Sequence, residues 1–301
     1  MLPIIHHPDY RIPLRPGHRF PMSKYGYLRE ALERRGLMPE GAMLAPSPAT
    51  SAQISLAHDP DYVNRVFDGA LTDLEVRRIG LPGNAKVTRR ARLATAGTML
   101  ATWMALEHGI AANTAGGSHH AGPEGGAGFC VFNDVAVAAM AVLDREGPSP
   151  ILIIDADVHQ GDGTARIFAN EPRVFCFSIH AEKNYPAEKP SSDLDIGLPD
   201  GTGDADYLAA LSAGLKRAMD ESQPALVFYN AGVDVWEGDR LGRLALTSEG
   251  VRARDRLVIE TVRGASVPLI GAIGGGYDDD PERLANHHAI LFEEAARVAG
   301  A

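Results

Sequence analysis

Two aspartates and a histidine, Asp155, Asp157 and His159, alternate directly after the apolar run 151–154. The run predicts a buried strand, and ligands bind beyond the carboxyl ends of the strands in an open α/β sheet. Side chains two residues apart on an extended chain point the same way. We therefore expect Asp157 and His159 to bind one ion, with Asp155 on the same side behind them. Carboxylates and imidazoles are the ligands of catalytic metal sites, so this stretch predicts a metal-dependent enzyme.

Three further clusters follow other predicted strands. They read GGSHHAG at 116–122, NAGVD at 230–234 and GGGY at 274–277. Each cluster alone also fits a turn, a core histidine pair or an aromatic plug, because short motifs often match by chance. All four clusters stand at strand ends, where separate parts of a chain deliver polar groups to one edge of a sheet. We therefore interpret them together as one active site.

Short apolar runs alternate with longer helical patterns along the chain. Strands are predicted at 2–5, 110–113, 151–154, 174–179, 226–229 and 268–273. Helices are predicted at 23–35, 88–107, 134–145, 163–169, 204–221, 248–263 and 282–298, with Thr88 as the cap of the second. The stretches 81–84 and 186–203, rich in Pro and Gly, are predicted as loops. This order predicts an α/β fold, a single domain over 1–301 whose mainly parallel sheet has helices on both faces.

The composition excludes several classes of protein. The formal net charge of −10 argues against a nucleic-acid partner, because phosphate binding needs clustered Lys and Arg. No apolar run approaches the roughly 20 residues that span a bilayer, and the N-terminus lacks the pattern of a secretory signal. The two cysteines, Cys130 and Cys176, lie in apolar surroundings and fit a reducing compartment, so we expect a cytoplasmic protein.

Five motifs resemble those of the zinc-dependent histone deacetylase family, which shares its fold with arginase. They are GGSHHAG, GAGFCVFND, DADVHQGDGT, NAGVDVWEGDRLG and GGGY. The resemblance runs from Pro16 to Tyr277, and the stretch 228–246 is most similar to the class IV branch and its bacterial relatives. It implies the arginase/deacetylase fold and one zinc ion per chain, with Asp157, His159 and Asp234 as the zinc ligands.

The resemblance also implies the groups that handle protons. His119 and His120 match the tandem active-site histidines of the family. Asp155 would orient His119, and Asp162 would orient His120, as carboxylate partners of imidazoles do. Tyr277 matches the tyrosine that donates a hydrogen bond to the carbonyl oxygen of the substrate.

A substrate tunnel and structural potassium ions are further implications of the resemblance. The tunnel and substrate-binding residues would be Gly128, Phe129, Tyr185, Leu241 and Gly275. The inner potassium ion would be bound by Ser178 Oγ and the Ile179 carbonyl with backbone oxygens near the zinc ligands, and the outer ion by Phe168 and Val174.

These groups together imply amide hydrolysis. We expect a zinc-dependent amidohydrolase that removes acetyl or longer fatty acyl groups from lysine side chains of proteins or peptides. A deacetylase of polyamines or other small acylated amines is an alternative, and so is a catalytically silent sensor of acylated amines.

An arginase-like enzyme with two metal ions is the nearest rival. It would need a second carboxylate two residues after Asp234, where Trp236 stands. The chain also lacks a long loop insertion of the kind with which acetylpolyamine relatives dimerise, which favours a monomer and a protein or peptide substrate.

Overall fold

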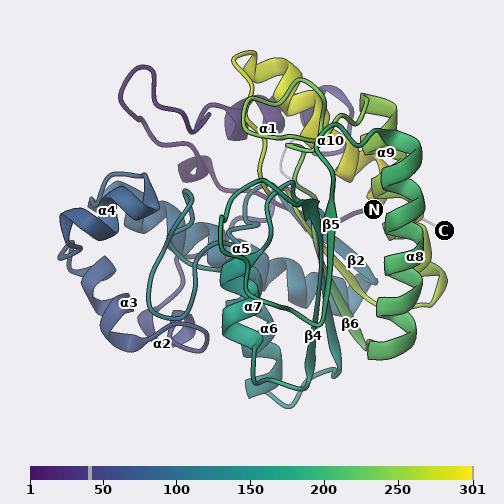
Figure 1. Cartoon of the computed structure of the whole chain (residues 1–301). Coiled ribbons are helices and arrows are strands. Elements are labelled where there is room, and N and C mark those ends of the chain that lie inside the picture. The colour runs from purple at the N-terminus through teal and green to yellow at the C-terminus, as the bar shows by residue number, and fades with distance from the viewer. Residues whose placement is uncertain (40–42, 300–301) are drawn as a thin grey trace.

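Parallel strands form the centre of the computed structural model, which describes residues 1–39 and 43–299 (Figure 1). Among these residues the strands form one seven-stranded sheet in the order β1-β2-β7-β6-β3-β4-β5, and every pairing is parallel. The strands are β1 (Ile4–Ile5), β2 (Ile110–Asn113), β3 (Ile151–Asp155), β4 (Val174–Ala181), β5 (Leu194–Leu198), β6 (Leu226–Asn230) and β7 (Leu269–Ala272).

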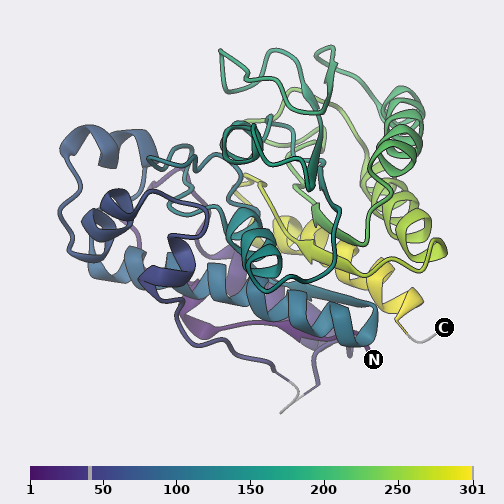
Figure 2. The same ribbon diagram turned by 90° about the horizontal axis from the view of Figure 1, so that it is seen from below.

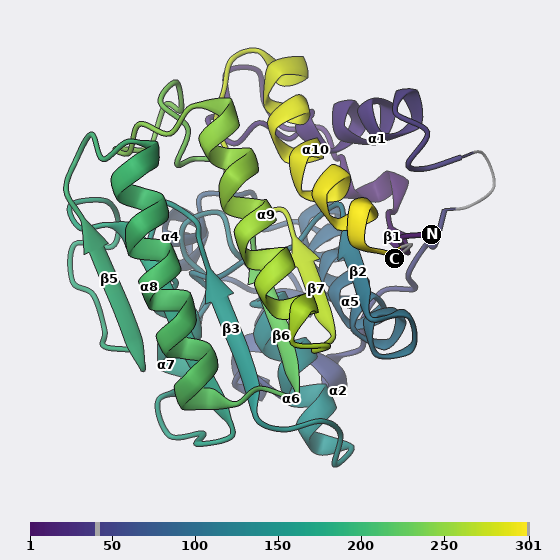
Figure 3. The ribbon, with the colours of Figure 1, turned by 90° about the vertical axis from the view of Figure 1, so that its right-hand side faces the viewer.

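Helices cover both faces of this sheet. The α-helices of the described residues are α1 (Lys24–Arg34), α2 (Ser51–Ile54), α3 (Pro60–Phe67), α4 (Asp73–Ile79), α5 (Ala85–His108), α6 (Asp134–Asp144), α7 (Asp162–Phe168), α8 (Asp204–Ser222), α9 (Ser248–Gly264) and α10 (Pro281–Val298). In Figure 3, α8, α9 and α10 lie on one face, with α5 and α6 behind the strands. The strands β2, β3, β6 and β7 are therefore buried along their whole length and carry continuous apolar runs. The predicted α/β fold is confirmed.

The four motif clusters follow β2, β3, β6 and β7, which are neighbours in the sheet. The chain passes from β3 to β4 on one side and from β6 to β7 on the other, so the strand order reverses between β3 and β6. Ligands bind in the crevice at such a reversal. The register sets Asp155 opposite both Asn230 and Ser178. Segments far apart in the sequence therefore end side by side at one edge.

The long helix α5 begins at Ala85, so the predicted cap at Thr88 is wrong. Asn84 is the N-cap, and its side chain accepts hydrogen bonds from the backbone N–H groups of Lys86 and Val87. An asparagine in this position satisfies N–H groups that the first turn of the helix leaves without partners. The helix therefore starts one turn earlier than its apolar spacing predicts.

The predicted loop 186–203 contains the edge strand β5, so this prediction is wrong in part. Only the two end residues of β5 are buried, which leaves no apolar run to mark it. The short helices α2, α3 and α4 also lie outside the predicted helices, because so few residues show little periodicity. They group together at one side of the molecule (dark blue in Figure 2). Both α2 and α4 begin with a capping box, Thr50 with Gln53 and Thr72 with Glu75.

Candidate active site

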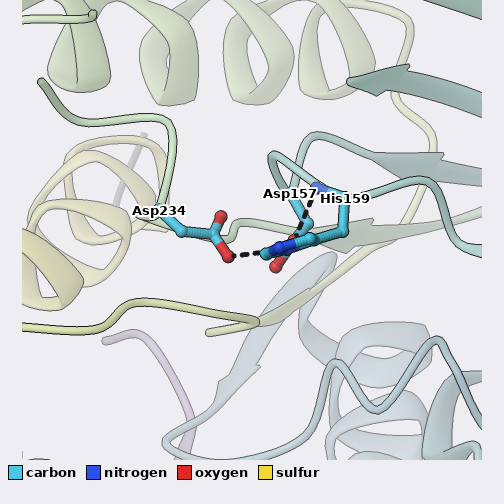
Figure 4. Close-up of side chains that lie close together, drawn as sticks. All are labelled: Asp157, His159 and Asp234. Atoms are coloured by element: carbon cyan, nitrogen blue, oxygen red, sulfur yellow. Dashed lines mark hydrogen bonds and ion pairs between the residues drawn. The ribbon is translucent and has the colours of Figure 1, made fainter. Parts of the chain in front are cut away.

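Asp157, His159 and Asp234 meet at the reversal point of the sheet (Figure 4). His159 Nδ1 lies 3.0 Å from Asp157 Oδ1 and 3.3 Å from Asp234 Oδ2. All three side chains are buried, and one ligand atom from each lies within 4.8 Å of the others. A single hydrogen on Nδ1 can serve only one carboxylate, and Asp234 Oδ2 has no hydrogen-bond partner among the described residues. Two buried carboxylates, an imidazole and an unsatisfied oxygen suit a divalent cation.

The strand β3 ends at Asp155, so the predicted alternation along one extended strand does not continue to His159. Hydrogen bonds shape the bend that follows. Asp155 Oδ1 accepts from the N–H of Asp157 at 3.2 Å, and Asp157 Oδ1 accepts from the N–H of His159 at 3.0 Å. Asp234 Oδ1 accepts from the N–H of Val158 at 2.9 Å, which ties the bend to the segment after β6. The ligands converge because of this network.

Gly275 lies against the same ligands, in the turn after β7. Its N–H donates to Asp157 Oδ2 at 2.7 Å. A Cβ at this position would lie 2.1 Å from Asp234 Oδ2 and 2.6 Å from Asp157 Oδ2, so only glycine permits the approach. The buried Lys24, which is not among the predicted site residues, donates from Nζ to the Gly274 carbonyl at 3.1 Å. Lys24 thereby holds the glycine turn from behind, and burial lowers its pKa to about 8.

Each tandem histidine is hydrogen-bonded to its own buried carboxylate. His119 Nδ1 lies 2.6 Å from Asp155 Oδ2, and His120 Nδ1 lies 2.7 Å from Asp162 Oδ1. The two imidazole rings lie with their centroids 4.1 Å apart. Arg166, one turn along α7, contacts the other oxygen of Asp162 and holds it in place. Because both Nδ1 atoms are engaged, each Nε2 is left for a reacting group.

Burial and neighbouring charges give the two histidines different pKa values. Although burial favours its neutral form, Asp155 and Asp157 raise the pKa of His119 to about 9. Burial and the neighbouring His119 lower the pKa of His120 to about 3. Burial also raises the pKa of Tyr277 well above its ordinary value, so its phenol stays protonated. The site thus holds a neutral proton acceptor beside two donors.

Asp134, also outside the predicted site residues, fixes the loop that carries the histidines. Its Oδ2 accepts from the N–H of Gly117 at 3.2 Å, and its Oδ1 accepts from the N–H of Ser118 at 2.8 Å. The neighbouring Asn133 donates from Nδ2 to the Ala121 carbonyl at 3.2 Å. Both residues close the motif GAGFCVFND, so the sequence carries a signal for them.

A cavity of about 380 Å³ opens from the surface onto His120 and His159. Its wall includes Gly128, Phe129, Tyr185, Leu241 and Tyr277. The Tyr185 ring stands edge-on to that of His120, with centroids 4.8 Å apart. The rings of Phe129 and Tyr277 lie 5.9 Å apart. Four of the five predicted substrate residues therefore line this cavity, and Gly275 lies at its inner end beside the metal ligands.

The turn Gly128-Phe129 is held by the end of α4. The N–H of Gly128 donates to the Arg78 carbonyl at 3.1 Å, and the N–H of Phe129 donates to the Ile79 carbonyl at 2.7 Å. The φ angles are 53° and 68°, so Phe129 adopts a left-handed conformation that a non-glycine residue rarely takes. A Cβ at Gly128 would lie 2.5 Å from His120 Cδ2. An unpredicted helix thus positions one wall of the cavity.

The predicted potassium ligands lie along β4 and at the end of α7. Ser178 and Ile179 stand near its carboxyl end, where Ser178 pairs with Asp155 in register and its Oγ lies 2.9 Å from His180 Nδ1. Val174 begins the strand. Phe168 ends α7, and its carbonyl accepts from the N–H of Glu171 at 3.0 Å. The inner set therefore lies in the second half of β4, and the outer set lies at the start of β4 and the end of α7.

A model of the histone deacetylase domain matches residues 18–292. The chain belongs to the histone deacetylase family. It is 46% identical over 296 residues to an uncharacterized protein of Picosynechococcus sp., with 98% of this chain and 99% of that protein covered. It is 32% identical over 276 residues to Histone deacetylase 2 of Arabidopsis thaliana, with 89% and 71% covered.

The crystal structure of the HDA15 HD domain shares the arginase/deacetylase fold with this chain. Its TM-score is 0.78 at 21% identity, with 98% of this chain and 91% of that chain covered. The family membership makes this chain a deacetylase-family hydrolase, whereas the class IV branch remains a prediction. In the part of the chain that the structure describes, no helix has the length and apolar character needed to cross a membrane.

Proposed function

We propose that this chain is a zinc-dependent deacylase that removes acetyl or longer acyl groups from lysine side chains of peptides or proteins. The observation that carries the proposal is the convergence of three kinds of group on one cavity. A metal-ligand set, two histidine–aspartate pairs and a protonated tyrosine all reach its inner end. Amide hydrolysis needs each of them.

The ligand set fits zinc. Two carboxylates and one imidazole are the protein ligands of an open, catalytic zinc site rather than of a closed, structural one. The oxygen Asp234 Oδ2, buried without a hydrogen-bond partner among the described residues, is accounted for by a cation. When bound, zinc would polarise the acyl carbonyl and lower the pKa of water.

The chain's own residues would move the protons. His120, neutral and tied through Nδ1 to Asp162, accepts a proton from the attacking water on Nε2 and returns it to the leaving amine. His119, hydrogen-bonded to Asp155, stabilises negative charge that develops on the substrate. Tyr277 donates a hydrogen bond to the carbonyl oxygen, and loss of such a donor lowers the rate by about 10²–10³.

The cavity favours a narrow, apolar stem. Phe129 and Tyr185 contribute aromatic walls, and Leu241 adds an aliphatic one. An unbranched acyl-lysine side chain sheds its hydration water and lies between such walls. A branched or charged stem would not bind there in this way.

Kinetics on a matched series of substrates test the function. We expect zinc-loaded protein to hydrolyse acetyl-, octanoyl- or myristoyl-lysine peptides faster than acetylputrescine. Tyr277→Phe should lower kcat by about 10²–10³ with little change in KM. Failure to hydrolyse any of these substrates, with Tyr277→Phe indistinguishable from the parent, would instead favour a silent sensor.

Two finer features remain part of the proposal. Structural potassium would bind near Ser178 and Ile179, with a second ion near Phe168 and Val174, and potassium-dependent thermal stability would support this. Both cysteines are free and buried, which is consistent with a reducing, cytoplasmic location.

A further inference from the structure

Four positively charged side chains ring the mouth of the active-site cavity. They are Arg19, Arg78, Lys183 and Arg243, and all four are exposed. Among the described residues, no Asp or Glu lines the mouth of this cavity, because the carboxylates of the metal site lie at its inner end. The whole sequence has 39 Asp and Glu against 29 Lys and Arg. The mouth is therefore positively charged although the molecule as a whole is acidic. Anions are attracted to the entrance of the active site.

A second hollow extends this positive surface. It has a volume of about 310 Å³ and shares Gly128 and Phe129 with the mouth. Arg15 and Arg77 line it beside two cations of the mouth, and again no Asp or Glu lines it within the described ranges. The positive surface thus continues from the mouth along the outside of the turn that forms the cavity wall.

Most of the mouth cations are free to bind a ligand. Arg243 Nη1 lies 3.0 Å from Asp200 Oδ2 at the surface and is already paired. Arg19, Arg78 and Lys183 form no ion pair with any residue of 1–39 or 43–299. Three unpaired cations at one mouth repel one another, so an anion bound among them lowers the energy of all three.

We propose that the mouth selects acylated amines that carry an anionic group close to the acylated side chain, with Arg19, Arg78 and Lys183 binding that group. This inference rests on the proposed deacylase function. An acyl-lysine whose amide reaches His120 leaves its backbone and its neighbours at the mouth, where the cations lie. A flanking Asp or Glu carboxylate has the required chemistry, and so does the α-carboxylate of free acyl-lysine.

The same cations would exclude other substrates. A polyamine or a lysine-rich peptide brings several positive charges to the mouth and is repelled there. Charge at an exposed mouth acts mainly on association, so the selection should appear in kcat/KM and weaken as salt is added.

Three acetyl-lysine peptides that differ only in flanking residues test the proposal: one with Glu, one with Gln and one with Lys on both sides. At low ionic strength we expect kcat/KM for the Glu peptide to exceed that for the Gln peptide about tenfold, the combined effect of a few exposed charge pairs. The kcat/KM for the Lys peptide should be lower than that for the Gln peptide. High salt should make the three kcat/KM values nearly equal. Fluorescence anisotropy of labelled peptides should give the same order of affinity.

Variants identify the groups responsible. The double substitution Arg19→Gln and Arg78→Gln should reduce the Glu-over-Gln preference to about twofold or less. Arg217→Gln serves as the matched control, because Arg217 pairs with Glu221 on α8, away from the mouth, and it should keep the tenfold preference. A double variant that retains the full preference overturns the assignment of these residues.

Free acetyl-lysine and its carboxamide separate the two sources of the anion. A preference confined to the free carboxylate assigns the site to small substrates, and a preference among the peptides assigns it to acidic side chains. Equal rates for all three peptides and for both small amines overturn the proposal and leave the deacylase function standing. Absence of any turnover overturns the deacylase function, and the proposal falls with it.

Discussion

Asp239 Oδ2 accepts a hydrogen bond from the backbone N–H of Tyr277 at 2.6 Å. Its other oxygen accepts from the N–H groups of Leu241 and Gly242 at 2.8 and 2.9 Å. The N–H of Arg240 in turn donates to the Tyr277 carbonyl at 3.0 Å. One half-buried carboxylate therefore ties the tyrosine to the loop after β6 that also carries a wall of the cavity.

We predict that Asp239→Asn lowers kcat/KM about tenfold to hundredfold. Asparagine keeps one accepting oxygen, so either the loop or the Tyr277 N–H loses its partner, and a small displacement of a catalytic group has a large effect on rate. Steady-state kinetics on an acyl-lysine peptide give the measurement. Asp279→Asn is the matched control, because Asp279 lies two residues beyond Tyr277 and is exposed. Equal activity of the two variants would contradict a positioning role.

Gly128→Ala should damage activity more than stability. The added Cβ would meet His120 Cδ2 at 2.5 Å, and the φ of 53° adds about 1 kcal/mol of backbone strain for alanine. We expect kcat/KM to fall about hundredfold, since His120 must move, while the melting temperature falls by only a few degrees. Gly125→Ala in the same loop is the control, because its Cβ would meet nothing within 4 Å. A fully active Gly128→Ala would show that His120 tolerates displacement.

Zinc should stabilise the folded chain through Asp234. At a zinc concentration 100 times the Kd, ligand binding adds about 2–3 kcal/mol to the free energy of unfolding, and a chelator removes it. Asp234→Asn should abolish this thermal shift. The metal-free variant should be at least as stable as the metal-free parent, because burial and the neighbouring Asp157 disfavour a charge on Asp234. Asp220→Asn, at an exposed site on α8, should retain the shift. A zinc response that survives Asp234→Asn would exclude this residue as a ligand.

His58 should make stability depend on pH. It is buried, its Nδ1 lies 2.8 Å from the Gly122 carbonyl, and its Nε2 accepts from the N–H of Asn133 at 2.9 Å. Burial lowers its pKa in the folded state from 6.5 to about 4. The unfolded state therefore takes up a proton first as pH falls, so the stability that His58 provides is complete above pH 6.5 and is lost towards pH 4. The loss amounts to about 3 kcal/mol.

Denaturant unfolding of the parent and of His58→Gln across this range measures the effect. Glutamine is neutral throughout, so the stability difference between the two proteins should shrink as the pH falls from 6.5 to 4. The exposed His108→Gln should show no such trend. A difference that stays constant over this range would rule out His58 as the titrating group.

The sequence by itself determined the family, the central strands and the residue types of the site. The buried strands β2, β3, β6 and β7 are continuous apolar runs, because both faces of each are covered, and that pattern is visible without a structure. The chemical motifs stand directly after those runs, so the sheet topology alone brings Asp155 and Asn230 opposite each other.

Only the tertiary structure decided how the site is held and what surrounds it. Asp239 is hydrogen-bonded to Tyr277, 38 positions along the chain, and Lys24 to Gly274, 250 positions along. No local pattern in the sequence encodes such contacts. The strand β5 and the helix α4 are too short or too exposed to carry a periodic signal, yet α4 fixes Phe129. The positive mouth likewise joins a residue of α4 to residues from three distant loops of an acidic chain. Charge at a site depends on which surface residues folding brings together, and a sequence records only their sum.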